Sequence, residues 1–178
     1  MLEFLIGLDI AVTSALMHVL PHNIVLDYLF LFFSLNGLTV IMWGILLILF
    51  IYWEDKHHKK FTFLFLLSFL TTSFLVNIAM KNIIRRERPY IAQNITNQFC
   101  PTDYSFPSGH ASGAFAGAVI FAYFDKKRKW MYYSIAGLIA YSRIYLSCHY
   151  FFDVFFGAYM GYMISKIYLF NLTRNNIE

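Results

Sequence analysis

The sequence predicts an all-α integral membrane protein, a single domain with about five transmembrane helices and one further helix at the N-terminus. Of its 178 residues, 59% are hydrophobic and 13% are charged, whereas soluble domains average about 45–50% apolar and about 25% charged residues. The aromatic share is 20%, which suits an outer surface that faces lipid. The apolar residues form runs of about 20, the length that crosses a bilayer as a helix. This composition excludes a disordered chain, a coiled coil and a soluble globule.

The first apolar run, residues 4–20, is predicted to be a helix that ends at Pro21, because proline cannot continue a helix. One side of this helix is polar and carries Glu3, Gly7, Ser14 and His18. Asp9 lies on the opposite side and weakens the amphipathic pattern. We expect residues 1–22 to lie in the membrane interface, and the alternative is a sixth transmembrane helix.

Five later segments are predicted to span the membrane, and charged or polar breaks separate them. The predicted spans are Tyr28–Trp53, Phe61–Met80, Ser108–Phe124, Trp130–Leu146 and Val154–Phe170. The strongest breaks are the charged stretches at 54–60 and 125–129. Together with the N-terminal helix, these spans make residues 1–178 one membrane-embedded domain.

The basic residues predict how the chain is oriented in the membrane. The net charge is +4, but the basic residues sit in short breaks between spans, which favours a membrane over nucleic acid as the partner. With the 54–60 loop in the cytoplasm, nine of the 14 Lys and Arg residues lie inside, namely Lys56, Lys59, Lys60, Lys126, Lys127, Arg128, Lys129, Lys166 and Arg174. The other five lie outside, namely Lys81, Arg85, Arg86, Arg88 and Arg143. Because the positive-inside rule disfavours basic residues on the outer side, the position of these five requires another explanation.

The first polar cluster runs from Lys81 to Pro89 at the end of a predicted span. Lys81 and Arg88 are seven residues apart, so on a continued helix they share a face and could converge on one anion. We expect Pro89 to stop that helix. Taken alone, the cluster could also be an interfacial patch that contacts lipid headgroups.

The second cluster, Ser105 to His110, opens the third predicted span. A helix start presents free N–H groups that suit a phosphate, and Gly109 lets the backbone approach a ligand closely. Ser108 adds a hydroxyl donor, and His110 adds a group that titrates near neutral pH. Taken alone, His110 could also be a structural histidine. Further along this span, glycines at 113 and 117 favour close helix packing.

The third cluster contains Arg143, His149 and Asp153. His149 and Asp153 are four residues apart, so a helix would place them on one face, where the carboxylate could fix the imidazole tautomer. We expect the chain to turn between Arg143, which ends one span, and His149, which opens the next. A purely structural His–Asp pair is the alternative.

The predicted topology brings all three clusters to one face. Ionisable groups at membrane depth are functional candidates by default. Three cations, two histidines, one carboxylate and a helix N-terminus, with no acid cluster to neutralise them, describe a site for a dianionic phosphate with a nucleophile and a proton donor. The predicted active-site segments are residues 81–107 and 142–153.

The three clusters together resemble the three signatures of the type 2 phosphatidic acid phosphatase superfamily. The matching residues are Lys81-x6-Arg88-Pro89, Pro107-Ser-Gly-His110 and Ser142-Arg143-x5-His149-x3-Asp153. The resemblance covers about residues 5–170, and the short chain is similar to compact bacterial undecaprenyl pyrophosphate and phosphatidylglycerophosphate phosphatases.

The resemblance implies a helical membrane phosphatase that uses neither a metal nor another cofactor. It implies that His149 attacks phosphorus and forms a phosphohistidine, that Asp153 orients His149, and that His110 protonates the leaving oxygen. It implies that the phosphate oxygens are held by Lys81, Arg88, Ser108, Gly109 and Arg143. The implied substrate is a lipid phosphate or pyrophosphate, and the implied location is the bacterial inner membrane, with the site facing the periplasm or exterior.

Other functions remain open at this point. A lipid A 1-phosphatase or a lipid-to-lipid phosphotransferase would use the same residues. A non-enzymatic transporter or scaffold is disfavoured because binding alone needs no His110, His149 and Asp153. The oligomeric state is left open. Cys100 and Cys148 could form a disulfide that holds the 91–104 loop near the site, or they could be unrelated thiols.

Overall fold

The computed structural model describes residues 1–34, 41, 43–45, 48, 52, 58–92 and 100–174, and every regular element in these residues is helical. The prediction of an all-α fold is therefore confirmed for the described part of the chain. The elements, in order, are α1 (Leu2–Met17), α2 (Ile24–Ser34), α4 (His58–Ser73), the π-helix η1 (Phe74–Met80), α5 (Lys81–Ile84), α6 (Pro89–Ala92), α7 (Gly109–Phe124), the 3-10 turn η2 (Lys126–Arg128), α8 (Lys129–Tyr145) and α9 (Phe151–Arg174).

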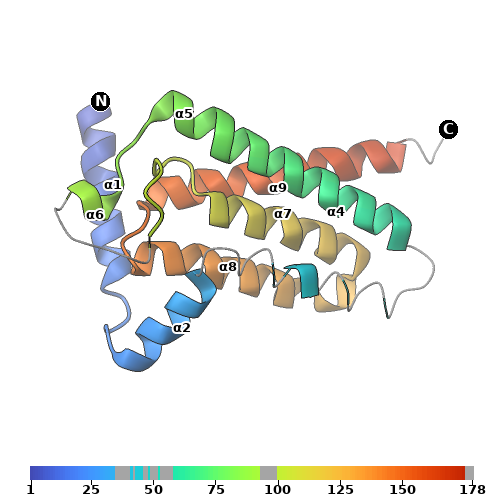
Figure 1. Ribbon diagram of the computed structural model, residues 1–178, viewed down its shortest axis with the longest axis horizontal. Helices are drawn as coiled ribbons and strands as arrows, with labels where there is room; N and C mark the ends of the chain where they lie inside the picture. Colours follow the sequence, from blue (N-terminus) through green and yellow to red (C-terminus); the bar gives the residue numbers. More distant parts are fainter. Residues whose placement is uncertain are drawn as a thin grey trace.

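Helix α7 lies at the centre of the bundle and packs against α4, α8 and α9, as Figure 1 shows. Its small residues explain this position, because they let neighbouring helices approach closely. Gly113 lies against the Phe69 ring and Gly117 against the Trp43 indole. These contacts confirm that the glycines at 113 and 117 serve helix packing.

Helices α7 and α9 approach one another closely at two glycines of α9, Gly157 and Gly161. A Cβ atom at Gly157 would lie 2.5 Å from the Ser108 carbonyl oxygen, and one at Gly161 would overlap the Ser112 carbonyl. Only glycine fits at such backbone-to-backbone contacts. At these two positions the backbone of α9 therefore lies directly against the backbone of α7, with no side chain between them.

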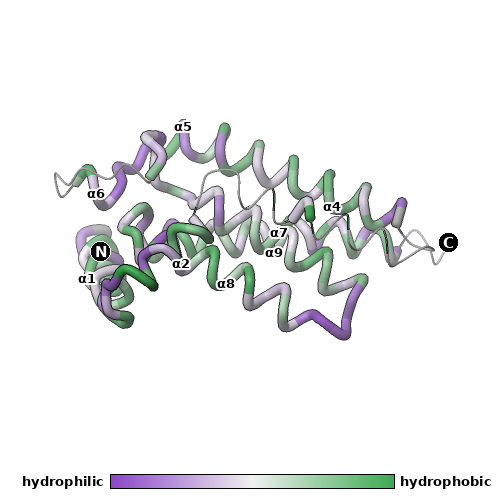
Figure 2. The backbone as a smooth tube through the Cα atoms, turned by 60° about the horizontal axis from the view of Figure 1, so that its bottom comes forward, coloured by the Kyte–Doolittle hydropathy of each residue, from purple (hydrophilic) through white to green (hydrophobic). Residues whose placement is uncertain are grey.

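Charge and hydropathy divide the bundle along its length. Figure 2 shows hydrophilic residues around α5 and α6 at one end and at the start of α8 at the other, with apolar helix between them. Among the described residues, the stretch Lys59–Ala92, which runs from α4 through η1 and α5 to α6, is long and apolar enough to cross a membrane. Helices α2 and α7 are shorter and apolar.

The predicted spans at 61–80, 108–124, 130–146 and 154–170 each coincide with helix in the structure. The span predicted at 28–53 begins in α2, and most of its remainder lies outside the described residues. The number of membrane crossings stays a prediction.

Helix α1 crosses the end of the bundle near α5 and α6 (Figure 1). It contacts the start of α9 through hydrogen bonds in which the Phe151 N–H donates to Thr13 Oγ1 at 2.9 Å and the Phe152 N–H donates to Asp9 Oδ1 at 2.8 Å. The first N–H groups of a helix have no partner within that helix, so α1 supplies the N-terminal cap of α9. The interfacial location of α1 stays a prediction.

Candidate active site

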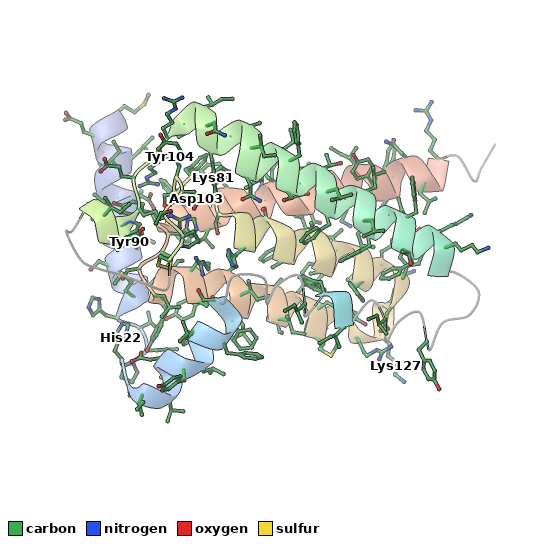
Figure 3. All side chains as sticks on the ribbon, viewed as in Figure 1. His22, Lys81, Tyr90, Asp103, Tyr104 and Lys127 are labelled. Carbon is green, nitrogen blue, oxygen red and sulfur yellow. A yellow bond between two sulfur atoms is a disulfide. The ribbon has the colours of Figure 1, made fainter. Side chains whose placement is uncertain are left out.

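All three polar clusters meet at the end of the bundle that α1 crosses. A cavity of about 210 Å³ opens there, between the α4–η1 rod and α7. Five of the predicted site residues line it, namely Lys81, Arg88, Gly109, His110 and His149. Figure 3 shows Lys81 and Asp103 pointing toward one another at this end, far from Lys127. The predicted convergence of the clusters is confirmed.

The first cluster reaches the cavity by a different route from the one expected. The helix ends at Ile84, and Arg85 adopts the left-handed conformation with φ 51°. Arg88 therefore does not continue the helical face of Lys81. Pro89 does not stop a helix but begins α6, where its missing N–H costs nothing. The expectation of one continuous helical face was wrong, although both side chains are buried at the cavity.

The Asp103 carboxylate lies between these two cations. One of its oxygens forms an ion pair with Lys81 Nζ, and the other accepts a hydrogen bond from Arg88 Nη2 at 2.5 Å. Burial acts to raise the pKa of Asp103, but the hydrogen bond and charge of Lys81, with the charge of Arg88, outweigh it and lower the pKa. The sequence shows no acid cluster beside the cations, but this single carboxylate neutralises the pair, which was not expected.

The second cluster forms the start of α7, as predicted. Ser108 is the N-cap, and its hydroxyl oxygen accepts the Ala111 N–H at 3.4 Å. The Ser108 N–H donates to the Asp153 carbonyl at 2.9 Å, which ties the start of α7 to the start of α9. Gly109 faces Asn77, whose amide oxygen occupies the position that a Cβ at 109 would need. His110 follows on the first turn and lines the cavity beside Ser112.

Arg143 lies in the last turn of α8 and is fully buried. Its Nη1 donates to the Ser34 carbonyl at 2.8 Å and also contacts the Ser34 hydroxyl. Among the described residues, its Nε and Nη2 have no hydrogen-bond partner. A buried guanidinium with two unpartnered donors is costly, so an anion supplied from outside would complete this part of the site.

His149 lies in the turn before α9, which begins at Phe151. The chain does turn between Arg143 and His149, as expected, but His149 and Asp153 do not share a helical face, because His149 precedes the helix. Arg88 Nη1 lies 2.9 Å from His149 Nε2. A guanidinium can only donate, so Nε2 carries the lone pair and Nδ1 carries the proton in this arrangement.

The protonated side of His149 faces Asp153 across Ser105. His149 Nδ1 is 3.7 Å from Asp153 Oδ2 and 3.3 Å from Ser105 Oγ. Ser105 Oγ donates to Asp153 Oδ2 at 2.5 Å. The Ser105 hydroxyl therefore bridges the carboxylate and the imidazole, where the sequence suggested direct contact. Neither Ser105 nor this bridge was predicted.

His149 is buried, and its surroundings favour the neutral imidazole. Burial lowers the pKa of His149 well below its ordinary value, and the positive charges of Arg88, Arg143 and Lys81 lower it further, while Asp103 acts in the opposite direction. The neutral imidazole has one lone pair, on Nε2, and in this structure that lone pair accepts the hydrogen bond from Arg88 Nη1.

Cys100 and Cys148 form a disulfide, with their Cα atoms 5.4 Å apart. The bridge ties the loop that carries Asp103 to the residue immediately before His149. The Tyr90 hydroxyl holds the same loop by donating to the Pro101 carbonyl at 3.1 Å. The disulfide, one of two alternatives open from the sequence, is present in this structure.

Sequence reasoning missed three charged residues around the site: Asp9, Arg86 and Asp103. Asp103 left no signal, because one acid in a polar loop is ordinary. Asp9 did leave one, since a carboxylate on the apolar side of a helix needs a buried partner. That partner is Arg86, which the sequence placed among the outer cations without a role of its own.

Comparisons with known proteins point to one family. A family model described as the PAP2 superfamily matches residues 61–177. A curated undecaprenyl-diphosphatase from Sulfolobus acidocaldarius is 34% identical over 113 residues, which cover 62% of this chain and 54% of that protein. Phosphatidylglycerophosphatase B from Bacillus subtilis is 34% identical over 119 residues, which cover 61% of this chain and 57% of that protein. The matched region thus spans a little over half the length of each curated relative.

Two crystal structures have a similar fold. LpxE from Aquifex aeolicus has a TM-score of 0.71 and 26% identity, covering 91% of this chain and 94% of that chain. A transmembrane PAP2-type phosphatidylglycerolphosphate phosphatase from Bacillus subtilis has a TM-score of 0.67 and 23% identity, covering 98% of this chain and 88% of that chain. The described helices therefore adopt the fold of a known transmembrane protein.

Proposed function

This chain belongs to the PAP2 superfamily, and from that premise we propose that it is an integral membrane phosphatase that hydrolyses a lipid phosphate monoester or pyrophosphate. The observation that carries the proposal is the placement of His149 in the cavity. Its Nε2 faces the cationic side chain of Arg88, and its Nδ1 faces Ser105 and Asp153. A nucleophile for phosphorus needs a lone pair and a cationic surrounding that attracts the phosphate. The Nε2 lone pair becomes free when the Arg88 guanidinium turns from His149 to the phosphate.

In the first step, His149 Nε2 attacks phosphorus and the bond between phosphorus and the leaving oxygen breaks. His110 donates its proton to that oxygen as it leaves, so the lipid alcohol or lipid monophosphate departs and a phosphohistidine remains. In the second step, His110 removes a proton from water, the water oxygen attacks phosphorus, and the bond to His149 breaks. Inorganic phosphate is released, and both histidines return to their starting state.

The phosphate oxygens are held by cations and by the start of α7. Lys81 and Arg88 reach them after releasing Asp103, and Arg143 offers its two unpartnered donors. The Ser108 hydroxyl and the Gly109 N–H complete the set, because a helix N-terminus favours an anion. Most of the rate enhancement in such a site comes from positioning and charge stabilisation.

We also propose that the reaction needs no metal ion. The donors that surround the cavity are mostly cationic, whereas Mg²⁺ and Ca²⁺ are bound by carboxylate and carbonyl oxygens. Lys81, Arg88 and Arg143 would provide the positive charge that a metal supplies in other phosphatases. Activity should therefore survive an excess of EDTA.

The substrate is proposed as a class, since the two curated relatives carry the names of different lipids. Undecaprenyl pyrophosphate and phosphatidylglycerophosphate share a terminal phosphate on an apolar carrier, which is the chemistry the cavity recognises. Transfer of the phosphate to a second lipid, or cleavage of the 1-phosphate of lipid A, would use the same first step. In both cases His149 would carry the phosphate.

The deciding experiment measures phosphate release from purified protein in detergent. Undecaprenyl pyrophosphate, phosphatidylglycerophosphate, phosphatidic acid and lipid A are compared, each with and without EDTA, and with vanadate as inhibitor. Release that survives EDTA and is blocked by vanadate supports the proposal. Strict dependence on added Mg²⁺ would overturn the metal-independent mechanism, and no release or transfer from any lipid would overturn the function.

We propose further that the active site faces the periplasm or exterior. Lys127 lies at the end of the bundle opposite Lys81 (Figure 3), and α9 ends at that same opposite end (Figure 1). The positive-inside rule then places that opposite end in the cytoplasm, with phosphate binding as the reason why Lys81, Arg88 and Arg143 lie on the outer side. A C-terminal green fluorescent protein fusion should fluoresce, and a C-terminal alkaline phosphatase fusion should be inactive. The reverse result would overturn the orientation.

A further inference from the structure

Arg86 links two buried carboxylates that lie on different helices. Its Nη1 donates to Asp153 Oδ1 at 2.7 Å, and its Nη2 lies 2.7 Å from Asp9 Oδ2. Asp9 is 1% exposed and Asp153 is fully buried. The guanidinium also lies over the Tyr150 ring, 3.9 Å from its centroid. Arg86 is therefore held on three sides and does not line the cavity that would receive the phosphate.

The position of Arg86 is set by α1. Asp9 is itself fixed, because its Oδ1 accepts the Phe152 N–H at 2.8 Å while its Oδ2 faces Arg86. The guanidinium donates a hydrogen bond to Asp153 Oδ1, and its contact with Asp9 Oδ2 is an ion pair without hydrogen-bond geometry. A compact ammonium group does not offer the same planar fork to two carboxylates. The chain of contacts thus runs from α1 through Arg86 to Asp153.

Asp153 needs such support because its link to His149 is indirect. Oδ2 accepts hydrogen bonds from Ser105 Oγ at 2.5 Å and from the Tyr150 N–H at 2.9 Å. Oδ1 is held by Arg86. Without Arg86 the carboxylate could rotate, and the Ser105 hydroxyl would no longer be held against His149 Nδ1.

We propose that Arg86 is a positioning residue for the phosphatase reaction: with Asp9 of α1 it holds Asp153, and through Ser105 it fixes the orientation and charge balance of His149. This inference rests on the proposed function but concerns residues outside the phosphate cavity. It gives the N-terminal helix a part in catalysis, because Asp9 is the residue that anchors Arg86. The inference also explains why Arg86 lies on the outer side although it does not bind the phosphate.

The kinetic test compares Arg86→Gln with Arg85→Gln as the matched control. Arg85 is exposed, and its Nε donates to the Asn82 carbonyl at 2.9 Å, so the control removes the same charge one residue away. We expect kcat of Arg86→Gln to fall about 10- to 100-fold with KM changed less than about twofold, since support of a reacting group affects the transition state more than substrate binding.

Arg86→Gln leaves two buried carboxylates unpaired and could fail to fold, so two milder variants accompany it. Arg86→Lys keeps the charge and should recover part of the lost kcat. Asp9→Asn keeps the acceptor for the Phe152 N–H but loses the charge that holds Arg86, and it should lower kcat severalfold. Equal activity of these variants and Arg85→Gln would overturn the inference.

A second readout does not depend on turnover: the titration of His149 by NMR in protein labelled with ¹⁵N-histidine, assigned by comparison with His149→Asn. The charged and titratable groups that face His149 are Lys81 on α5, Arg88 and Asp103 in the loops, His110 on α7, Arg143 on α8 and Asp153 on α9. Removing Arg86 leaves the Asp153 charge uncompensated, which stabilises the imidazolium. We expect the pKa of His149 to rise in Arg86→Gln and to stay unchanged in Arg85→Gln.

The two readouts separate the inference from the function on which it rests. If the wild-type protein releases no phosphate from any lipid, the proposed function fails, and the NMR titration alone decides whether Arg86 sets the state of His149. If the wild type is active but His149 titrates identically in Arg86→Gln and Arg85→Gln, Arg86 is only structural and the inference fails.

Discussion

The Asp103 carboxylate accepts a hydrogen bond from Arg88 Nη2 at 2.5 Å, and the Arg88 Nε donates to the Asp103 carbonyl at 2.7 Å. The same carboxylate is ion-paired with Lys81. Asp103 thus occupies the two cations that a phosphate would need. Its side chain is 49% exposed, while that of Arg88 is 1% exposed, so the carboxylate is the partner that can move away.

Asp103→Asn should therefore tighten anion binding. Removing the competing charge leaves Lys81 and Arg88 free for the phosphate, so the inhibition constant of vanadate and the KM should each fall, by about three- to tenfold for a half-exposed charge. Inhibition and steady-state assays measure both constants. Asp125→Asn is the control, because Asp125 pairs with Arg128. Weaker vanadate binding by Asp103→Asn would show that Asp103 holds the cations in place instead of competing for them.

His149→Ala should abolish turnover while lipid phosphate and vanadate still bind. Loss of a nucleophile costs several orders of magnitude in kcat, whereas the cations that hold the phosphate remain. Asp153→Asn should lose less, because its effect on the imidazole is indirect. His18→Ala, at an exposed histidine whose Nδ1 contacts the Ser14 carbonyl, is the control. Activity above about a tenth of wild type in His149→Ala would exclude it as the nucleophile.

On the acid side of its pH profile, the rate should decline only in distinctly acid solution. Burial and the neighbouring cations hold the pKa of His149 below its ordinary value of about 6.5. The neutral nucleophile thus persists as the pH falls through 6.5, and kcat/KM should begin to drop only below that pH. In the unfolded chain His149 keeps its ordinary pKa, so protonation favours unfolding and stability is lost as the pH falls below about 6.5. If kcat/KM instead fell on acidification with an apparent pKa above 7, the prediction that His149 stays neutral would be contradicted.

The disulfide should stabilise the protein measurably. Cys100 and Cys148 close a loop with a sequence separation of 48 residues, and a cross-link of this span contributes on the order of 4 kcal/mol by restricting the unfolded chain. Cys100→Ser/Cys148→Ser should lower the melting temperature by several degrees and loosen the loop that carries Asp103. Mass spectrometry after alkylation without reductant checks the bridge itself. Two alkylated cysteines in protein purified under oxidising conditions would show that it does not form.

Gly161→Ala should be strongly destabilising. The added Cβ would overlap the Ser112 carbonyl and lie 3.1 Å from the Ala116 nitrogen, so α9 must move away from α7, at a cost of about 1–3 kcal/mol. Gly137→Ala is the matched control, because nothing lies within 4 Å of its Cβ position, and alanine favours a helix by up to about 1 kcal/mol over glycine. Thermal unfolding in detergent compares them. Equal melting temperatures would mean that the α7–α9 contact is looser than described.

Much of the fold and five of the residues that line the cavity could be predicted from the sequence, because they depend on local patterns. Runs of apolar residues mark the helices, and the position of Pro107 and Ser108 before an apolar run marks the start of α7. The route by which Lys81 and Arg88 converge could not be predicted. It depends on the left-handed backbone conformation of Arg85. Glycine and asparagine favour this conformation, so an arginine gives no signal for it in the sequence.

The residues that support the site were beyond sequence reasoning for a different reason. Asp9 and Asp153 are joined by Arg86 across 144 positions of the chain, and no periodicity encodes a contact at that distance. The packing role of Gly157 and Gly161 could not be predicted either, because the sequence does not show whether a glycine faces lipid or a neighbouring backbone.

The cap that α1 provides to α9 sets an order for assembly during biosynthesis. The Phe152 N–H lies 143 residues after its acceptor Asp9, and at ribosomal rates of about 5–20 residues per second this separation takes roughly 7 to 30 s to synthesise. Through that interval Asp9 lacks the α9 backbone that later buries it, and a carboxylate in this state is costly inside hydrocarbon. We therefore expect α1 to stay at the membrane surface during that interval and to dock only when α9 has been made.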